Sequence, residues 1–350
     1  MSDINIRVTG QAGRITLTRG KALNALSYDM CMAIDAAMRQ WAQDDAITLV
    51  VIDAEGEKAF CAGGDIAELY QTGKAGDFDY GRKFWSDEYR LNALIFEYPK
   101  PVVSFLQGFT MGGGVGIGCH GTHRVVGDSS QISMPETGIG LIPDVGGTLM
   151  LTLAPGRLGE YLGCTGARMK AADAIYAGFA DLYIPESFWP ILIANLEKDG
   201  DTGVLDLASQ TPPEGKLHAL QGEIDRSFAG ETLTDILTVL QGETSDFAEQ
   251  TRKVLARNSA LSMACTVEVV HRLRSSTLSI RKALEMEYRF TYRAMEKSDF
   301  LEGIRAQIID KDRQPKWQYA QQDVPATAVS QMLLPLGADA LGFELDFEED

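Results

Sequence analysis

Three glycine-rich segments of the sequence each follow a short apolar stretch, and their composition suits the binding of a carbonyl oxygen. They are AFCAGGDI at 59–66, GFTMGGGVGIG at 108–118 and MPETGIGLIPDVGG at 134–147. Glycine lets backbone N–H groups approach a ligand closely, and two such groups aimed at one point would form an oxyanion hole. For any single loop, a role in tight turns alone is an equally good interpretation.

The third of these segments contains two acids, Glu136 and Asp144, on either side of the glycine-rich stretch 137–143. Side chains at the two ends of one loop can point into one pocket, where burial and mutual repulsion push their pKa values apart. One acid can then act as nucleophile or base while the other handles a proton. We therefore predict that both are catalytic. The structural alternative is that Glu136 caps a helix and Asp144 occupies a turn before two glycines.

Motifs of several other enzyme classes are missing or lack their context. The sequence contains no GxxxxGK[ST], HExxH or GxSxG motif, which removes the usual nucleotide, zinc-protease and serine-hydrolase sites. A GxGxxG match begins at Gly116, but a strand expected at 124–126 follows too soon for the crossover helix of a dinucleotide fold. His120 and His123 have no further metal-ligand spacing around them, so no metal site is expected.

The overall composition is that of an acidic protein, which does not exclude an anionic small ligand bound in a local basic pocket. The 350 residues include 32 Lys plus Arg and 49 Asp plus Glu, and the net charge of −17 argues against nucleic acid or an anionic membrane as partner. The five cysteines are scattered without CxxC spacing, and no apolar run is long enough to span a membrane. Because the first residues, MSDINIRV, do not resemble a signal peptide, a cytoplasmic protein is expected.

The elements that must position these loops follow an α/β pattern in the first part of the chain. Strands are expected at 4–8, 15–17, 49–52, 102–106, 124–126 and 132–134, and a helix is expected to begin after Ser27. Strand signals fade after about residue 186, and helices are expected at 217–240 and 260–274. We predict one domain over 1–323, with an α/β core at 1–190, a mainly helical region at 191–323 and an acidic tail at 324–350.

Taken together, the three loops resemble the enoyl-CoA hydratase/isomerase, or crotonase, superfamily, and the resemblance covers about residues 5–320. It implies an α/β, crotonase-like spiral of stacked β-sheet turns flanked by helices, with a helical C-terminal region. It also implies that Gly64 and Gly113 donate the N–H groups of the oxyanion hole. The substrate-binding residues that it implies in GKALNAL and in the first loop are Lys21, Ala22, Leu23, Ala62, Asp65 and Ile66.

Within that superfamily the sequence departs from the hydratases. Hydratases carry one glutamate two residues after the glycine triplet, where this chain has Gly116, and a second after a proline, which is kept here as Glu136. Asp144 stands where hydratases usually have glycine. Three segments are instead similar to the 3-hydroxyisobutyryl-CoA hydrolase branch. They are the third loop at 134–147, the segment DEYRLN around Glu88, and FLEGIRAQIIDKDRQPKW at 300–317.

This branch resemblance implies hydrolysis of a short 3-hydroxyacyl-CoA thioester, foremost 3-hydroxyisobutyryl-CoA to 3-hydroxyisobutyrate and CoA in valine catabolism. Glu88, Gly113, Glu136 and Asp144 match its substrate-site residues. Glu136 would attack the thioester or activate water, and Asp144 would orient the 3-hydroxyl. Coenzyme A arrives with the substrate, so no cofactor is expected, and a homo-oligomer fits the superfamily. Enoyl-CoA hydration or isomerisation, and silent acyl-CoA binding, stay open as alternatives.

Overall fold

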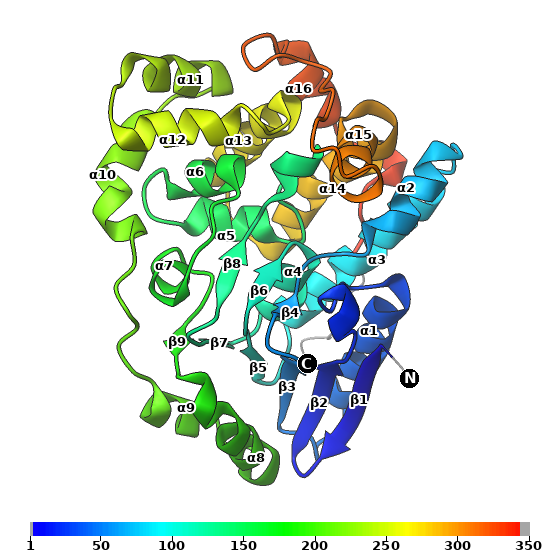
Figure 1. The fold of residues 1–350 in the computed structure, drawn as a ribbon. Helices are drawn as coiled ribbons and strands as arrows, with labels where there is room; N and C mark the ends of the chain where they lie inside the picture. The colour runs from blue at the N-terminus through cyan, green and yellow to red at the C-terminus, as the bar shows by residue number, and fades with distance from the viewer. Residues whose placement is uncertain (1–2, 344–350) are drawn as a thin grey trace. The chain divides into compact units, whose positions relative to one another are not determined.

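The computed structural model describes residues 3–343, which form two compact units that each combine several segments of the chain (Figure 1). The first unit contains the residues up to Asp65, Arg90–Ser133 and Arg168–His218. The second contains Ile66–Tyr89, Met134–Ala167 and the described residues from Ala219 onward. The chain therefore alternates between the units, and the predicted boundaries at 190 and 323 stay predictions.

The first unit holds every strand that the described residues form. The larger sheet has the order β1-β2-β3-β5-β7-β9, with strands Ile4–Thr9, Ala12–Leu17, Leu49–Ala54, Val102–Phe105, His123–Val126 and Leu182–Tyr183. Strands β1 and β2 pair antiparallel, and the other neighbours pair parallel. The smaller parallel sheet joins β4 (Ala59–Cys61), β6 (Phe109–Met111) and β8 (Gln131–Ser133).

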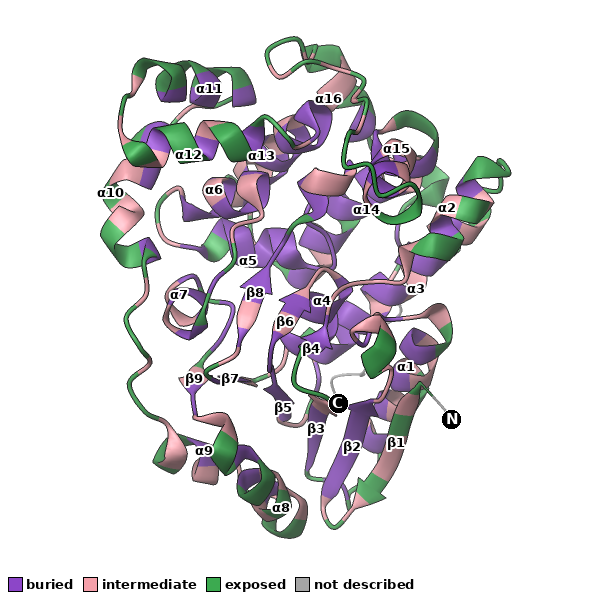
Figure 2. Cartoon of the chain, viewed as in Figure 1, coloured by how far each residue is buried: buried purple, intermediate pink, exposed green. Residues whose placement is uncertain are grey.

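The burial of the strands explains their sequences. Strands β2 and β5 are buried throughout, as Figure 2 shows. Strand β5 is a nearly continuous apolar run because a parallel strand is covered on both faces, whereas β2 includes the buried polar residues Arg14 and Thr16. Strand β1 lies at the sheet edge, and none of its residues is buried. The strands predicted at 4–8, 15–17, 49–52, 102–106, 124–126 and 132–134 are confirmed within a few residues.

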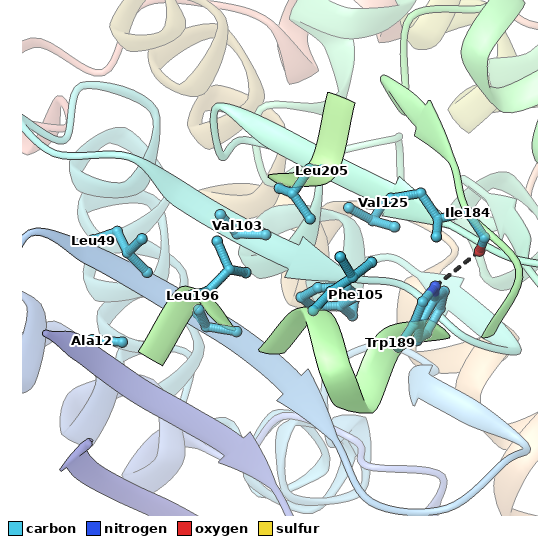
Figure 3. Close-up of a cluster of buried hydrophobic side chains, with 11 residues drawn as sticks. Ala12, Leu49, Val103, Phe105, Val125, Ile184, Trp189, Leu196 and Leu205 are labelled. Carbon is cyan, nitrogen blue, oxygen red and sulfur yellow. Dashed lines mark hydrogen bonds between the residues drawn. The ribbon is translucent and has the colours of Figure 1, made fainter. Parts of the chain in front are cut away.

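Helices of the first unit pack against its two sheets. They are α1 (Tyr28–Ala42), α4 (Gly113–Gly118), α7 (Ala171–Tyr176), α8 (Trp189–Asp199) and α9 (Gly203–Ala208). Ser27 caps α1 as predicted, because its side chain accepts a hydrogen bond from the Met30 N–H. In Figure 3, Leu196 and Trp189 of α8 pack with strand residues such as Phe105, and the Trp189 indole N–H donates to the Ile184 carbonyl at 2.9 Å.

The second unit is helical in its described residues. It contains α2 (Ile66–Lys74), α5 (Gly147–Leu153), α6 (Leu158–Thr165), α11 (Leu233–Gly242), α12 (Asp246–Leu255), α13 (Ala260–Arg274), α14 (Ile280–Lys297), α15 (Phe300–Ile304) and α16 (Ala326–Met332). Helices α3 (Asp79–Phe96) and α10 (Leu217–Ser227) each belong partly to both units. Buried α13 packs against α5 and α6, and its bounds agree with the predicted helix at 260–274.

The segment predicted as an acidic tail, 324–350, contains a helix near its start. Helix α16 lies inside the range 324–350, and its last residue, Met332, is buried. Residues 344–350 lie outside the described part of the chain. Among residues 3–343, no helix combines the length and apolar character needed to cross a membrane.

Candidate active site

Four carboxyl side chains lie together inside the second unit. Glu88 comes from α3, Glu136 from the 3-10 helix Glu136–Ile139, Asp144 from the loop before α5, and Glu287 from α14. None of the four residues is more than 4% exposed. Burial raises the pKa of Glu88, Glu136 and Glu287, and the charge of Asp144 adds to each increase. A cluster of this kind retains protons near neutral pH, because like charges without water cannot all ionise.

Asp144 and Glu287 are the members of the cluster that titrate nearest neutrality, since burial raises the pKa of Glu287 to about 8 while hydrogen bonds from Gly146 and Thr148 favour its ionised form. Burial raises the pKa of Asp144 to about 7, although a hydrogen bond from the Tyr89 hydroxyl and one from its own backbone N–H favour the ionised form. The Tyr89 hydroxyl donates to Oδ2 at 2.7 Å. Asp144 does occupy a turn, closed by a 2.7 Å bond from the Gly147 N–H to its carbonyl. The turn therefore presents an acid that can exchange a proton near pH 7.

Glu136 is buried with one oxygen unused. Its Oε2 has no hydrogen-bond partner among the described residues. Burial raises the pKa of Glu136 well above its ordinary value, and the nearby Asp144 and Glu287 charges raise it further. Glu136 is the first residue of its 3-10 helix and not the N-cap, which is Pro135, and its carboxyl group accepts a hydrogen bond from its own backbone N–H. An unpartnered buried carboxyl oxygen costs about 1–3 kcal/mol, which is typical of a group kept for a ligand.

Glu88 resembles Glu136 in its surroundings. It is buried on α3, and its Oε1 lacks a partner among the residues of the described chain. Its raised pKa keeps it protonated near neutral pH, so it can donate a hydrogen bond to a substrate oxygen. The three acids predicted from the sequence are thus brought together in one unit. Glu287 was missed, although an acid on the buried face of amphipathic α14 is an available signal.

The two glycines predicted to bind the oxyanion belong to loops that are neighbours in the first unit. Leu26 bonds with both residues that flank Gly64, through its N–H to Gly63 and its carbonyl to the Asp65 N–H, at 2.9 and 2.8 Å. In this parallel pattern the Gly64 N–H points away from Leu26. Gly113 is the first residue of α4, where N–H groups have no partner within the helix.

Close packing within the first unit brings these loops together. A Cβ on Gly114 would lie 2.2 Å from the Cys61 carbonyl oxygen, so only glycine lets α4 approach β4 this closely. A Cβ on Gly63 would lie 3.6 Å from the Met111 carbonyl oxygen. Whether the Gly64 and Gly113 N–H groups converge on one oxygen stays a prediction.

The segment predicted to bind coenzyme A is joined to the same loop. Lys21 and Ala22 lie in a 3-10 turn, and the following Leu23 accepts a 3.0 Å hydrogen bond from the Ala62 N–H. A cavity of about 530 Å³ lies beside this turn, and its wall includes Lys21 and Lys58. The other lining residues are Gly20, Leu23, Asn24, Glu55, Gly56, Glu57 and Ala59. The same wall includes Glu55 and Glu57, so acidic and basic side chains are equal in number there.

The remaining predicted substrate-binding residues are Asp65 and Ile66. Asp65 forms an ion pair with Arg19 at 2.7 Å, which ties its loop to the segment before Lys21. Ile66 opens α2 and belongs to the second unit. The structure therefore gathers the glycines and the coenzyme A segment in the first unit, and the acids in the second. In the described chain, no three His, Cys, Asp or Glu side chains are arranged to hold a metal ion.

Comparison with known families and proteins extends over nearly the whole chain. The enoyl-CoA hydratase/isomerase family model matches residues 12–333. The chain is 38% identical over 331 residues to a Danio rerio protein named 3-hydroxyisobutyryl-CoA hydrolase, mitochondrial, covering 90% of this chain and 85% of the relative. A Homo sapiens protein of the same name is 34% identical and covers 97% of this chain and 91% of its own. The resemblance predicted from the three loops is confirmed.

Two solved structures superpose closely on this one. An enoyl-CoA hydratase from Rhodobacter sphaeroides has a TM-score of 0.94 and 56% identity, and it covers 98% of this chain and all of its own. A carnitinyl-CoA dehydratase from Mycobacterium thermoresistibile has a TM-score of 0.93 and 38% identity, with 99% of this chain and all of its own covered. These matches confirm the predicted fold class.

Proposed function

The chain belongs to the enoyl-CoA hydratase/isomerase family, and we propose that it hydrolyses a short 3-hydroxyacyl-CoA thioester. The favoured reaction converts 3-hydroxyisobutyryl-CoA to 3-hydroxyisobutyrate and free coenzyme A, a step of valine catabolism. The buried pair Glu136 and Asp144 carries this proposal. The relatives from Danio rerio and Homo sapiens support it, since both are named for this hydrolase and match nearly their whole length.

The names of the two superposed structures favour a different reaction, the addition of water to an enoyl thioester or the reverse loss of water that forms one. The two-glutamate mechanism of hydratases needs an acid two residues after the glycine triplet. That position is Gly116, a buried residue inside α4. We therefore favour hydrolysis over hydration, while high overall identity speaks for a shared scaffold rather than for one chemistry.

In the proposed mechanism Glu136 faces the thioester. Its Oε2 is available, whereas Oδ2 of Asp144 is held by Tyr89. In its ionised form Glu136 either attacks the carbonyl carbon and displaces the thiolate, leaving a mixed anhydride that water hydrolyses to the free acid, or removes a proton from the water that attacks the carbonyl carbon. In both cases the C–S bond breaks and the leaving thiolate takes up a proton. Asp144 orients the 3-hydroxyl group and moves that proton, and protonated Glu88 donates to a substrate oxygen.

We further propose that the Gly64 and Gly113 N–H groups bind the oxyanion that forms from the thioester carbonyl. Each such donor stabilises the transition state by roughly 3 kcal/mol. The pocket beside Lys21 would take the nucleotide part of coenzyme A, with Lys21 and Lys58 facing its phosphates and outweighing the nearby Glu55 and Glu57.

Product analysis tests this function. Purified protein is incubated separately with 3-hydroxyisobutyryl-CoA, 3-hydroxypropionyl-CoA and crotonyl-CoA, and the products are separated and weighed by mass spectrometry. Free acid and coenzyme A from a hydroxyacyl thioester, with crotonyl-CoA unchanged, would support hydrolysis. A hydrated crotonyl product without free coenzyme A would support the hydratase alternative. Tight binding of all three without any product would support a silent acyl-CoA-binding protein.

Three accompanying properties belong to the same proposal. The reaction needs no resident cofactor or metal, so prolonged dialysis against a chelator should leave the rate unchanged. The protein acts in the cytoplasm as a homo-oligomer. The relatives' names include the word mitochondrial, so fractionation of the source cells and sedimentation of the purified protein are the corresponding tests.

A further inference from the structure

The turn that carries Asp144 has an unfavourable backbone conformation. Val145 has φ of 54° and Gly146 has φ of 81°, both in the left-handed region. Glycine adopts this region freely, but a β-branched residue such as valine is an outlier there, because its side chain clashes with its own backbone. Val145 persists in it only if other contacts hold the turn in place.

Besides the bond from the Gly147 N–H to the Asp144 carbonyl, the turn is held by the carboxyl group of Glu287 on α14. Oε2 of Glu287 accepts a hydrogen bond from the Gly146 N–H at 2.8 Å, and Oε1 accepts one from the Thr148 N–H at 3.0 Å. The Thr148 hydroxyl donates to Oε1 as well. Glu287 has no exposed surface, and within residues 3–343 it forms no ion pair. Both oxygens of Glu287 thus accept hydrogen bonds from the turn, Oε2 from Gly146 and Oε1 from Thr148.

Helix α14 also reaches Asp144 from its other side. Thr291 lies one helical turn after Glu287, so the two side chains share a face of α14. The Tyr89 hydroxyl, which donates to Asp144 at 2.7 Å, lies 3.4 Å from the Thr291 hydroxyl oxygen. The residues that follow Asp144 and the hydroxyl group that donates to its carboxylate are consequently both held by the same helix.

We propose that Glu287 is a positioning residue that holds the Asp144 carboxyl group in its reactive orientation by fixing the turn 144–148. This inference rests on the proposed function, since it assigns Glu287 a part in the reaction that Asp144 assists. Glu287 does not act on the substrate itself: its two oxygens are taken by the turn, whereas Glu136 and Glu88 each keep one oxygen unpartnered among the described residues.

The variant Glu287→Gln tests the proposal. A glutamine side chain has an NH2 group in place of one carboxyl oxygen, so one of the two backbone N–H groups would face a donor and lose its hydrogen bond. The turn then loses a hydrogen bond, Val145 relaxes out of the left-handed region, and Asp144 moves. A displacement of about 1 Å in a catalytic group lowers kcat by on the order of a hundredfold. We expect a loss of this size in kcat with KM close to the wild-type value.

A second substitution separates positioning from simple loss of stability. In Glu287→Gln/Val145→Gly, glycine keeps the left-handed conformation without strain, so Asp144 should return to its place. We expect the double variant to recover at least about tenfold of the lost kcat, even though removing the buried Val145 side chain lowers its melting temperature further. A purely structural role of Glu287 predicts the opposite order, with the less stable double variant also the less active.

Glu160→Gln is the matched control. Glu160 is likewise fully buried in the second unit, where it pairs with Arg157, His271 and Arg274 rather than with the acid cluster. Its substitution should lower the melting temperature and leave kcat near wild type.

Wild-type kcat in Glu287→Gln, or a double variant no more active than the single one, would overturn the positioning role. A wild-type protein that hydrates an enoyl thioester and releases no thiol would refute the proposed function instead. The same comparison of kcat, made on that hydration reaction, would then still decide the role of Glu287.

Discussion

The Tyr89 hydroxyl donates a 2.7 Å hydrogen bond to Oδ2 of Asp144, and both residues are buried. The bond favours the ionised carboxylate and so lowers the pKa of Asp144, whereas burial raises it. Burial has the larger effect, and the resulting pKa is about 7. Tyr89 and Asp144 lie 55 residues apart in the sequence, so this balance is set by the fold.

Replacing Tyr89 by phenylalanine should shift the pH dependence of the reaction. Without the hydroxyl donor the pKa of Asp144 rises further above 7, so a rate that needs ionised Asp144 reaches its plateau at higher pH. The measurement is kcat/KM for thiol release between pH 5.5 and 9 for both proteins. Tyr98→Phe is the control, because that buried hydroxyl donates to the Met38 carbonyl in the first unit. An unchanged profile in Tyr89→Phe would show that the titration of Asp144 does not govern the rate.

Gly113→Pro should remove one oxyanion donor with little disturbance of α4. Proline is tolerated at the first position of a helix, where its missing N–H breaks no helical bond. We expect kcat to fall by on the order of a hundredfold to a thousandfold. Circular dichroism and coenzyme A affinity serve to show that the fold and the nucleotide pocket are kept. Full activity in a folded Gly113→Pro protein would exclude this N–H from the oxyanion hole.

Asp144→Asn should make the protein less active but more stable at alkaline pH. The folded-state pKa of Asp144, about 7, lies above its ordinary value of 3.8. Such a group contributes its full stabilising effect below the ordinary value, and the contribution is lost as pH rises through about 7. An asparagine carries no charge, so the melting temperature of Asp144→Asn should exceed that of the wild type at pH 8.5 and approach it at pH 5. Equal differences at both pH values would contradict the raised pKa.

The sequence predicts much of the fold because its local patterns agree with the structure. Apolar runs mark β3 and β5, Ser27 caps α1, and the helical pattern at 260–274 coincides with α13. Strands β4 and β6 were missed. Each has three residues and runs into a glycine-rich loop, so neither shows enough alternation to be recognised.

The candidate site is predictable only where its residues lie close together in the sequence. Glu136 and Asp144 are found because one loop carries both of them. Glu287 meets Gly146 and Thr148 across 141 and 139 residues of sequence, a contact that no local pattern encodes. The division into two units has the same origin, since it depends on contacts between distant segments of the chain.

The central claim is that buried Glu136 drives thioester hydrolysis, and thiol release from 3-hydroxyisobutyryl-CoA by the wild type and by Glu136→Gln tests it most directly. The substitution keeps the size of the side chain and removes its ability to attack or to accept a proton. We predict rapid release by the wild type and a kcat lower by on the order of a hundredfold or more in the variant, with the thioester still bound. Equal rates in the two folded proteins, or no thiol release by the wild type, would contradict it.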